Sequence, residues 1–125
     1  MGCYLKRWDG GRLMKSFRGE IWLVRLNPVI GREQAGERPC LVVSVDLFNH
    51  GPAGLVVALP ITTKNKGIPF HVRVLPPEGG LKEISYIKCE DVRSLSTDRL
   101  VEKWGSITFE KLQLVEDRLR ILMGL

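Results

Sequence analysis

The sequence predicts an α+β fold, in which a small antiparallel β-barrel is followed by a C-terminal α-helix. Short runs rich in Val, Ile and Leu recur up to about residue 105, as in strands. Clusters of Pro, Gly and Asn separate these runs and mark turns. From Thr108 onward the apolar residues follow the period of a helix. A chain of 125 residues is large enough for one hydrophobic core but too small for two.

The expected strands occupy most of the chain before residue 108. They are Ile21–Leu26, Pro39–Asp46, Leu55–Ile61, His71–Val74, Ser85–Lys88 and Glu90–Ser94, with Leu100–Ile107 as a weaker seventh candidate. Six or seven short strands at this spacing are typical of a curled antiparallel sheet or a small barrel.

A single amphipathic helix is expected at the end of the chain. Its apolar stripe consists of Leu112, Val115, Leu119 and Leu122. Thr108 has the side chain of an N-cap, and Gly124 is a suitable helix stop. The helix would pack against the barrel through the apolar stripe.

The positive charge is concentrated at the N-terminus. Residues 1–18 contain five basic residues and one acidic residue, and so carry +4 of the net charge of +5. Residues 1–17 are therefore predicted to be a basic, flexible N-terminal extension, and residues 18–125 the folded domain. The extension could instead be an RNA-binding arm, but a basic pI alone is weak evidence for nucleic acid.

The cysteines and the apolar runs exclude several classes of protein. Cys3, Cys40 and Cys89 do not have metal-ligand spacing, and Cys40 and Cys89 lie in apolar runs where a free thiol behaves as a small hydrophobe. No metal site and no cofactor are expected. No apolar run approaches the ~20 residues that span a bilayer, and no signal peptide is recognisable, so a cytoplasmic protein without membrane contact is expected.

Three sequence blocks stand out. The first runs from Arg18-Gly19-Glu20-Ile21-Trp22 through a polar loop to Arg38-Pro39 and reads as a β-hairpin. The second is Pro60-Ile61-Thr62-Thr63, and the third is Ser85-Tyr86-Ile87-Lys88-Cys89-Glu90. In order and spacing these blocks closely resemble the MazF/PemK family of toxin endoribonucleases, over roughly residues 18–124.

The resemblance implies an SH3-like barrel and a homodimer. It also implies the toxin of a type II toxin–antitoxin system, an endoribonuclease that cleaves single-stranded RNA at particular sequences without a metal. In this chemistry the ribose 2′-hydroxyl attacks its own phosphate, which requires proton transfer and stabilisation of the phosphorane charge. The implied partners are single-stranded RNA and a small acidic antitoxin that blocks the active site.

Arg38 and Thr62 are the expected catalytic residues. Arg38 matches the family's Arg-Pro arginine, and its planar guanidinium can grip two phosphate oxygens at once. The alternative is an arginine that caps the loop through Glu33 or Glu37. Thr62 matches the family's Pro-Ile-Thr threonine, and its hydroxyl can donate to a phosphate or orient the 2′-hydroxyl. A register slip of one residue would put Thr63 in its place.

Lys88 and Glu90 are further candidates for catalysis or RNA binding. In an extended strand they would lie on one face, two residues apart, while Cys89 points inward. A surface ion pair is the alternative. Asp91 follows where the family often has Gln.

The hairpin loop is expected to bind RNA through Arg32, Glu33 and Gln34, with Arg32 replacing the family's usual serine. His71 reads as structural. Five aromatic residues are able to stack on bases, but most fit core or dimer contacts and none is assigned to a base pocket from the sequence; they are Trp22, Phe48, Phe70, Tyr86 and Trp104.

Two other functions are compatible with this fold. One is a protein-binding gyrase poison like CcdB, although a binder would not need the Arg-Pro and Pro-Ile-Thr blocks. The other is an RNA-binding module that has lost catalysis, since Lys88 and Asp91 depart from common family patterns. The cleavage sequence, the main class of target RNA and the identity of the antitoxin do not follow from the sequence.

Overall fold

The computed structural model describes residues 8–9, 12–13, 15–26 and 36–125. Two helices, α1 (Asp46–Asn49) and α2 (Phe109–Met123), and two 3₁₀ turns, η1 (Glu78–Gly80) and η2 (Thr97–Arg99), accompany the strands. The strands are β1 (Trp8–Asp9), β2 (Arg12–Leu13), β3 (Glu20–Arg25), β4 (Glu37–Val42), β5 (Leu55–Thr62), β6 (His71–Val74), β7 (Ser85–Lys88), β8 (Arg93–Ser96) and β9 (Leu100–Ser106).

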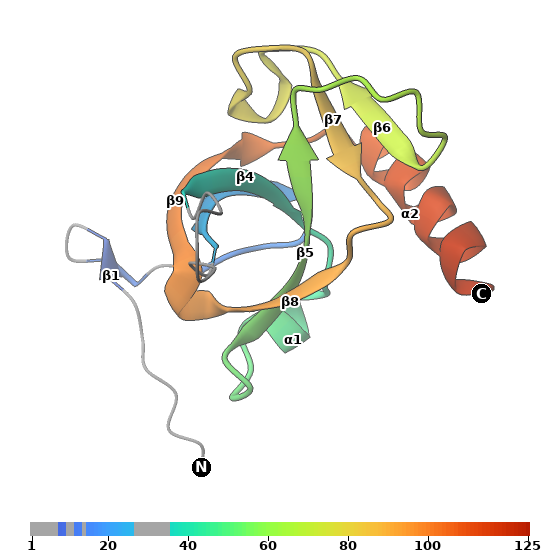
Figure 1. Cartoon of the computed structure of the whole chain (residues 1–125). Coiled ribbons are helices and arrows are strands. Elements are labelled where there is room, and N and C mark those ends of the chain that lie inside the picture. Colours follow the sequence, from blue (N-terminus) through green and yellow to red (C-terminus); the bar gives the residue numbers. More distant parts are fainter. Residues whose placement is uncertain (1–7, 10–11, 14, 27–35) are drawn as a thin grey trace, which may run out of the picture.

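Seven of these strands form one strongly curved antiparallel sheet. Its order is β6-β7-β5-β4-β3-β9, and β8 pairs with β5 outside this path. Hydrogen bonds between the described strands do not close the sheet. However, η2 leads directly from β8 to β9, so the chain curls round as a barrel does (Figure 1). The α+β prediction of a barrel-like sheet with a C-terminal helix is confirmed. Strands β1 and β2 pair only with each other among the described residues.

The middle strands are buried on both faces. Along β3, β4 and β5, successive side chains enter two different apolar clusters, as Ile21 and Trp22 do. One cluster lies between the sheet and α2 and includes Val115, and the other fills the inside of the curled sheet and includes Cys40. Since side chains alternate along a strand, the middles of these strands have no free face. Side chains that could bind a polar ligand are therefore expected at the strand ends.

Two strands have bounds that differ from the sequence prediction by more than one residue, since β4 is Glu37–Val42 and β8 is Arg93–Ser96. The strand expected over Pro39–Asp46 ends at Val42, because Asn49 donates to the Ser44 carbonyl at 2.9 Å and bonds the Ser44 hydroxyl, which starts the unpredicted helix α1. The strand expected over Glu90–Ser94 begins only at Arg93, because the chain first turns after β7. The other predicted strands agree to within one residue.

Helix α2 begins and ends as the sequence predicts. The Thr108 hydroxyl accepts a hydrogen bond from the Lys111 amide at 3.2 Å, and Gly124 takes the left-handed conformation after the last turn. Val115 is fully buried against the sheet. No helix in the described part of the chain is both long and apolar enough to cross a bilayer.

The segment that leads into β3 is fixed by α1, β4 and α2. His50 donates through Nε2 to the Ser16 carbonyl at 2.6 Å, and the Arg18 amide donates to the Asp46 carboxylate at 2.7 Å. The Arg18 guanidinium pairs with Glu116 of α2 and donates to the Val43 carbonyl. Residues 16–18 are therefore held against the domain, whereas most of the predicted N-terminal extension lies outside the described residues.

A glycine contact beneath β9 gives the first prediction. Gly80 has φ +77°, and a Cβ there would lie 2.3 Å from the Trp104 carbonyl oxygen. We expect Gly80→Ala to lower the free energy of unfolding by about 2–5 kcal/mol, because backbone strain and a clash add. Gly67→Ala is the control. Its φ is +64°, but no described atom lies within 4 Å of a Cβ built there, so only the backbone strain of about 1–2 kcal/mol is expected. Urea unfolding measures both, and equal losses would contradict the clash.

Candidate functional site

The ends of β4 and β5 bring Arg38 and Thr62 together. Cys40 of β4 pairs with Pro60 of β5 as the last pair of their ladder, and Arg38 and Thr62 each lie two residues beyond it, at the same end of the two strands. Residues two apart point to the same face of a strand, so both side chains lie on the face of Cys40 and Pro60. Thr62, rather than Thr63, therefore has the position that the sequence block predicts.

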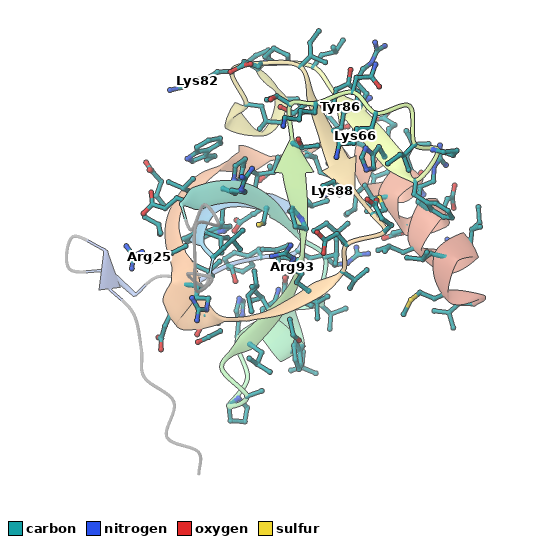
Figure 2. The ribbon with its side chains drawn as sticks, viewed as in Figure 1. Arg25, Lys66, Lys82, Tyr86, Lys88 and Arg93 are labelled. Carbon is teal, nitrogen blue, oxygen red and sulfur yellow. The ribbon has the colours of Figure 1, made fainter. Side chains whose placement is uncertain are left out.

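Strand β7 adds a lysine on the other side of Thr62. Thr62 pairs directly with Tyr86, and Lys88 follows two residues later on the same face of β7. Figure 2 shows Tyr86 and Lys88 along β7, and Arg93 near β8. Three strands thus deliver polar side chains to one region.

Asp91 connects two cations in this region. Arg93 donates from Nε and Nη2 to the two Asp91 carboxylate oxygens, both at 3.0 Å, and Lys88 Nζ lies 3.6 Å from the same carboxylate. The hydrogen bonds from Arg93 hold the pKa of Asp91 below its usual value, and the same bonds raise the pKa of Arg93. Arg38, Thr62, Lys88, Asp91 and Arg93 are called the basic patch below.

The buried thiol of Cys40 is affected by the charges of three residues of the basic patch. Burial raises the pKa of Cys40 to about 12, while the charges of Arg93 and Arg38 act to lower it and that of Asp91 acts to raise it. All three side chains therefore lie within electrostatic reach of one atom. Cys40 and Cys89 are buried free thiols, and burial raises the pKa of Cys89 to about 12 as well, which confirms that both behave as hydrophobes.

The Arg38 guanidinium is free for a ligand. The side chain is exposed and has no hydrogen bond or ion pair to any described residue. Glu37, one of the two acids that could have capped the loop with Arg38, pairs with Arg25 at 3.6 Å instead. The other, Glu33, lies outside the described residues together with Arg32 and Gln34, so the predicted RNA-binding loop stays a prediction.

Strand β7 ends at Lys88 and does not continue through Glu90 as the sequence pattern suggested. The Asp91 amide donates to the Lys88 carbonyl at 3.0 Å, so the chain turns after Lys88 and does not continue as a strand. The Glu90 carboxylate lies 3.0 Å from Nε2 of His71, whose side chain is only 4% exposed. The extended strand expected through Glu90 is therefore wrong. Lys88 pairs with Asp91, and Glu90 pairs with His71, which lies directly opposite Lys88 in the sheet.

Arg93 is the site residue that the sequence analysis missed. It lies two residues after Asp91 and pairs across the sheet with Ala58 of β5. An Asp-x-Arg spacing at the start of a strand puts both side chains on one face, which is the signal that could have found the pair.

The basic patch has the chemistry of a phosphate site. It holds three cations and one carboxylate, of which Lys88 and Arg93 pair with Asp91 while Arg38 is unpaired among the described residues. Guanidinium groups suit phosphate oxygens. The Thr62 hydroxyl accepts from the Lys64 amide at 3.2 Å and keeps its own proton to donate to an oxyanion. Within the described residues, the side chains of His, Cys, Asp and Glu form no group of three or more that could hold a metal ion.

Comparisons with known proteins give one consistent result. Residues 17–123 match the family described as PemK-like, MazF-like toxin of type II toxin–antitoxin system. The chain is 31% identical over 109 residues to endoribonuclease EndoA of Bacillus subtilis strain 168, covering 86% of this chain and 94% of EndoA.

Solved structures agree with the sequence comparison. MazF of Deinococcus radiodurans is 32% identical, with a TM-score of 0.74 over 90% of this chain and 99% of that one. The MazE–MazF structure from the same organism gives 32% identity and a TM-score of 0.76, over 90% and 98% of the two chains.

Proposed function

We propose that the chain cleaves single-stranded RNA at particular sequences without a metal ion, since it belongs to the PemK/MazF family of type II toxins and is an endoribonuclease of that family. The observation that carries the proposal is the convergence of Arg38, Thr62, Lys88 and Arg93 on one surface. Such a surface can hold a phosphodiester and stabilise added negative charge without a divalent cation.

In the proposed reaction the ribose 2′-oxygen forms a bond to the adjacent phosphorus, and the bond to the 5′-oxygen breaks. The 2′-hydroxyl loses a proton and the leaving 5′-oxygen gains one, so the products carry a 2′,3′-cyclic phosphate and a 5′-hydroxyl. Arg38 binds the non-bridging oxygens as charge develops on them. Thr62 donates a hydrogen bond to one of these oxygens or orients the 2′-hydroxyl.

The remaining charged residues have supporting roles in this proposal. Lys88 and Arg93 hold phosphates of the RNA backbone, and Asp91 fixes the Arg93 guanidinium with two hydrogen bonds. Glu90 is placed at His71 and positions that buried ring rather than the RNA. The loop residues Arg32, Glu33 and Gln34 would read the bases, as single-stranded recognition requires.

The proposed partners are a second copy of the chain and a small acidic antitoxin. Exposed apolar side chains on α2, among them Phe109 and Ile121 at 71% and 67% exposure, support a protein interface on this helix. The MazE–MazF structure of D. radiodurans supports an antitoxin partner, and the unpaired Arg38 side chain suits an acidic one that blocks the site. The proposed location is the cytoplasm, because the proposed substrate is RNA.

The test uses the purified chain and a long RNA in the presence of EDTA, with every cut mapped by primer extension. We expect cleavage at a small set of sequences, cyclic phosphate at the 3′ ends, and an unchanged rate when magnesium is added, since cationic side chains supply the charge stabilisation. A strict requirement for magnesium would contradict the mechanism. RNA binding without cuts would indicate a degenerate module, and inhibition of gyrase without cuts would indicate a CcdB-like poison.

A further inference from the structure

Five aromatic side chains were possible base-stacking groups, and the structure separates them. Trp22 is buried and donates from its indole nitrogen to Glu20 at 2.8 Å. Phe70 and Trp104 pack on the cluster beneath α2. Phe48 lies in α1, which Figure 1 shows at the end of the barrel away from β7. Only the fifth, Tyr86, lies next to the basic patch.

Tyr86 lies on the outer face of β7. Its chain neighbours Ser85 and Ile87 are buried, and Ile87 belongs to the cluster beneath α2, so the Tyr86 ring points to the opposite side of the strand. Tyr86 belongs to neither buried cluster, nor to the partly buried side chains that pack on them in the described part of the chain. The ring is therefore not a core residue.

The strands on both sides of β7 set the surroundings of the ring. Thr62 of β5 is its direct partner on one side, and Arg73 of β6 is its direct partner on the other. Directly opposed residues in an antiparallel sheet have Cβ atoms about 4.5–5.5 Å apart. Lys88 shares the same face of β7. The half-buried ring thus lies between Thr62 and the cations Arg73 and Lys88, and its hydroxyl has no hydrogen-bond partner among the described residues.

We propose that Tyr86 is a specificity-determining residue on which the base of a nucleotide next to the scissile phosphate stacks. This inference rests on the proposed function, because Thr62 and Arg38 locate the scissile phosphate. With that phosphate at Thr62 and a neighbouring one at Lys88, a flanking base falls over the ring between them. An aromatic platform beside cations is the general arrangement for holding single-stranded nucleic acid.

The ring and the hydroxyl of Tyr86 have different roles. Stacking on the ring accepts every base, because every base has a π-face. The unpartnered hydroxyl can donate to or accept from the edge of the stacked base, and so adds a preference among bases. Tyr86→Phe is therefore expected to keep the cleavage rate but to cut a broader set of sequences, while Tyr86→Leu loses rate at every sequence.

The decisive experiment removes the ring and the base separately and then together. Substrates carry one abasic nucleotide at each position flanking the cleavage site, and kcat/KM is measured for wild type and Tyr86→Leu. We expect one abasic position to cost wild type about 10- to 100-fold, the size of one lost base stack. The same position should cost Tyr86→Leu less than about 3-fold. Equal losses in both proteins at every position would overturn the proposal.

Two controls complete the design. Phe48→Leu also removes a partly exposed aromatic ring, but from α1 at the other end of the barrel, and should cleave every substrate as wild type does. Circular dichroism checks the fold of each variant.

A measurement on wild type alone covers the case in which Tyr86→Leu does not fold. The RNA carries a 2′-deoxy cleavage site, which blocks cutting, and 2-aminopurine at each flanking position in turn. Its fluorescence should be quenched at one position on binding, and no quenching at any position would overturn the proposal. If the wild-type protein binds RNA with quenching but never cuts the unmodified RNA, the proposed cleavage function is refuted, while the proposal that a base stacks on Tyr86 still stands.

Discussion

Arg38→Ala is expected to cleave RNA about 100- to 1000-fold more slowly than wild type, the usual cost of one well-placed electrostatic group. The Arg38 side chain has no partner among the described residues, and Arg38 and Thr62 lie at the same end of β4 and β5. Its contacts with the phosphate strengthen as charge develops, so the loss should fall on kcat rather than on KM. Single-turnover rates on a mapped substrate measure it.

Two companion variants sharpen this result. Arg38→Lys keeps the charge but loses the planar fork of donors, and should be nearly as slow as Arg38→Ala. Thr62→Ala removes one neutral hydrogen-bonding group and should be milder.

The matched control for the Arg38 variants is Arg120→Ala. Arg120 is an exposed arginine on α2 that pairs with Asp117 at 3.2 Å, so its removal takes the same charge from a distant surface. Each variant should keep the circular dichroism spectrum of wild type, because neither Arg38 nor Thr62 belongs to a buried cluster. A folded Arg38→Ala protein that cuts within a few-fold of wild type would remove Arg38 from the site.

The second large effect on cleavage is expected from a chemical change in the RNA substrate. Replacing the 2′-hydroxyl of the nucleotide at the cleavage site with hydrogen removes the proposed nucleophile, so cutting should stop altogether. Binding should stay close to that of the unmodified RNA, because the phosphates that meet the basic patch are unchanged. A gel-shift titration measures binding, and a time course measures cutting.

The same replacement at the neighbouring nucleotide is the control, and should leave cleavage within a few-fold of normal. Cutting at a 2′-deoxy position would show that water or a protein group attacks the phosphorus instead. That result would refute the mechanism. The phosphate-binding role of the basic patch would then still be tested by the Arg38 variants.

The sequence predicted correctly those elements whose bounds depend on the residues within and beside them. His71–Val74 and Ser85–Lys88 were predicted with the bounds that the structure has, because Pro, Gly or Glu residues flank two short β-rich runs. Thr108 and Gly124 set the ends of α2 through their own conformational preferences. Helix α1 was missed because the side chain of Asn49 and the backbone of Ser44 hold it, a contact that no periodicity reveals.

The site followed only in part. Arg38 and Thr62 are expected site residues because of their sequence blocks, but their approach to each other depends on the pairing of β4 with β5, which the sequence blocks do not reveal. The strand expected through Glu90 was wrong because the chain turns after Lys88, and a turn of this kind depends on a backbone hydrogen bond that the residue pattern does not reveal. Arg93 was missed because its role arises from the bonds to Asp91, and the Asp91 position had drawn notice only as a departure from the family.

The burial of β3, β4 and β5 on both faces has a consequence for how such a protein diverges. Positions in the strand middles can accept few substitutions, because each of them fills one of the two clusters. Positions near the strand ends that lie outside both clusters, such as Tyr86, can change at little cost in folding. Mutation can therefore explore new RNA sequences at these ends while the inherited scaffold stays intact, so relatives with one architecture can acquire different targets.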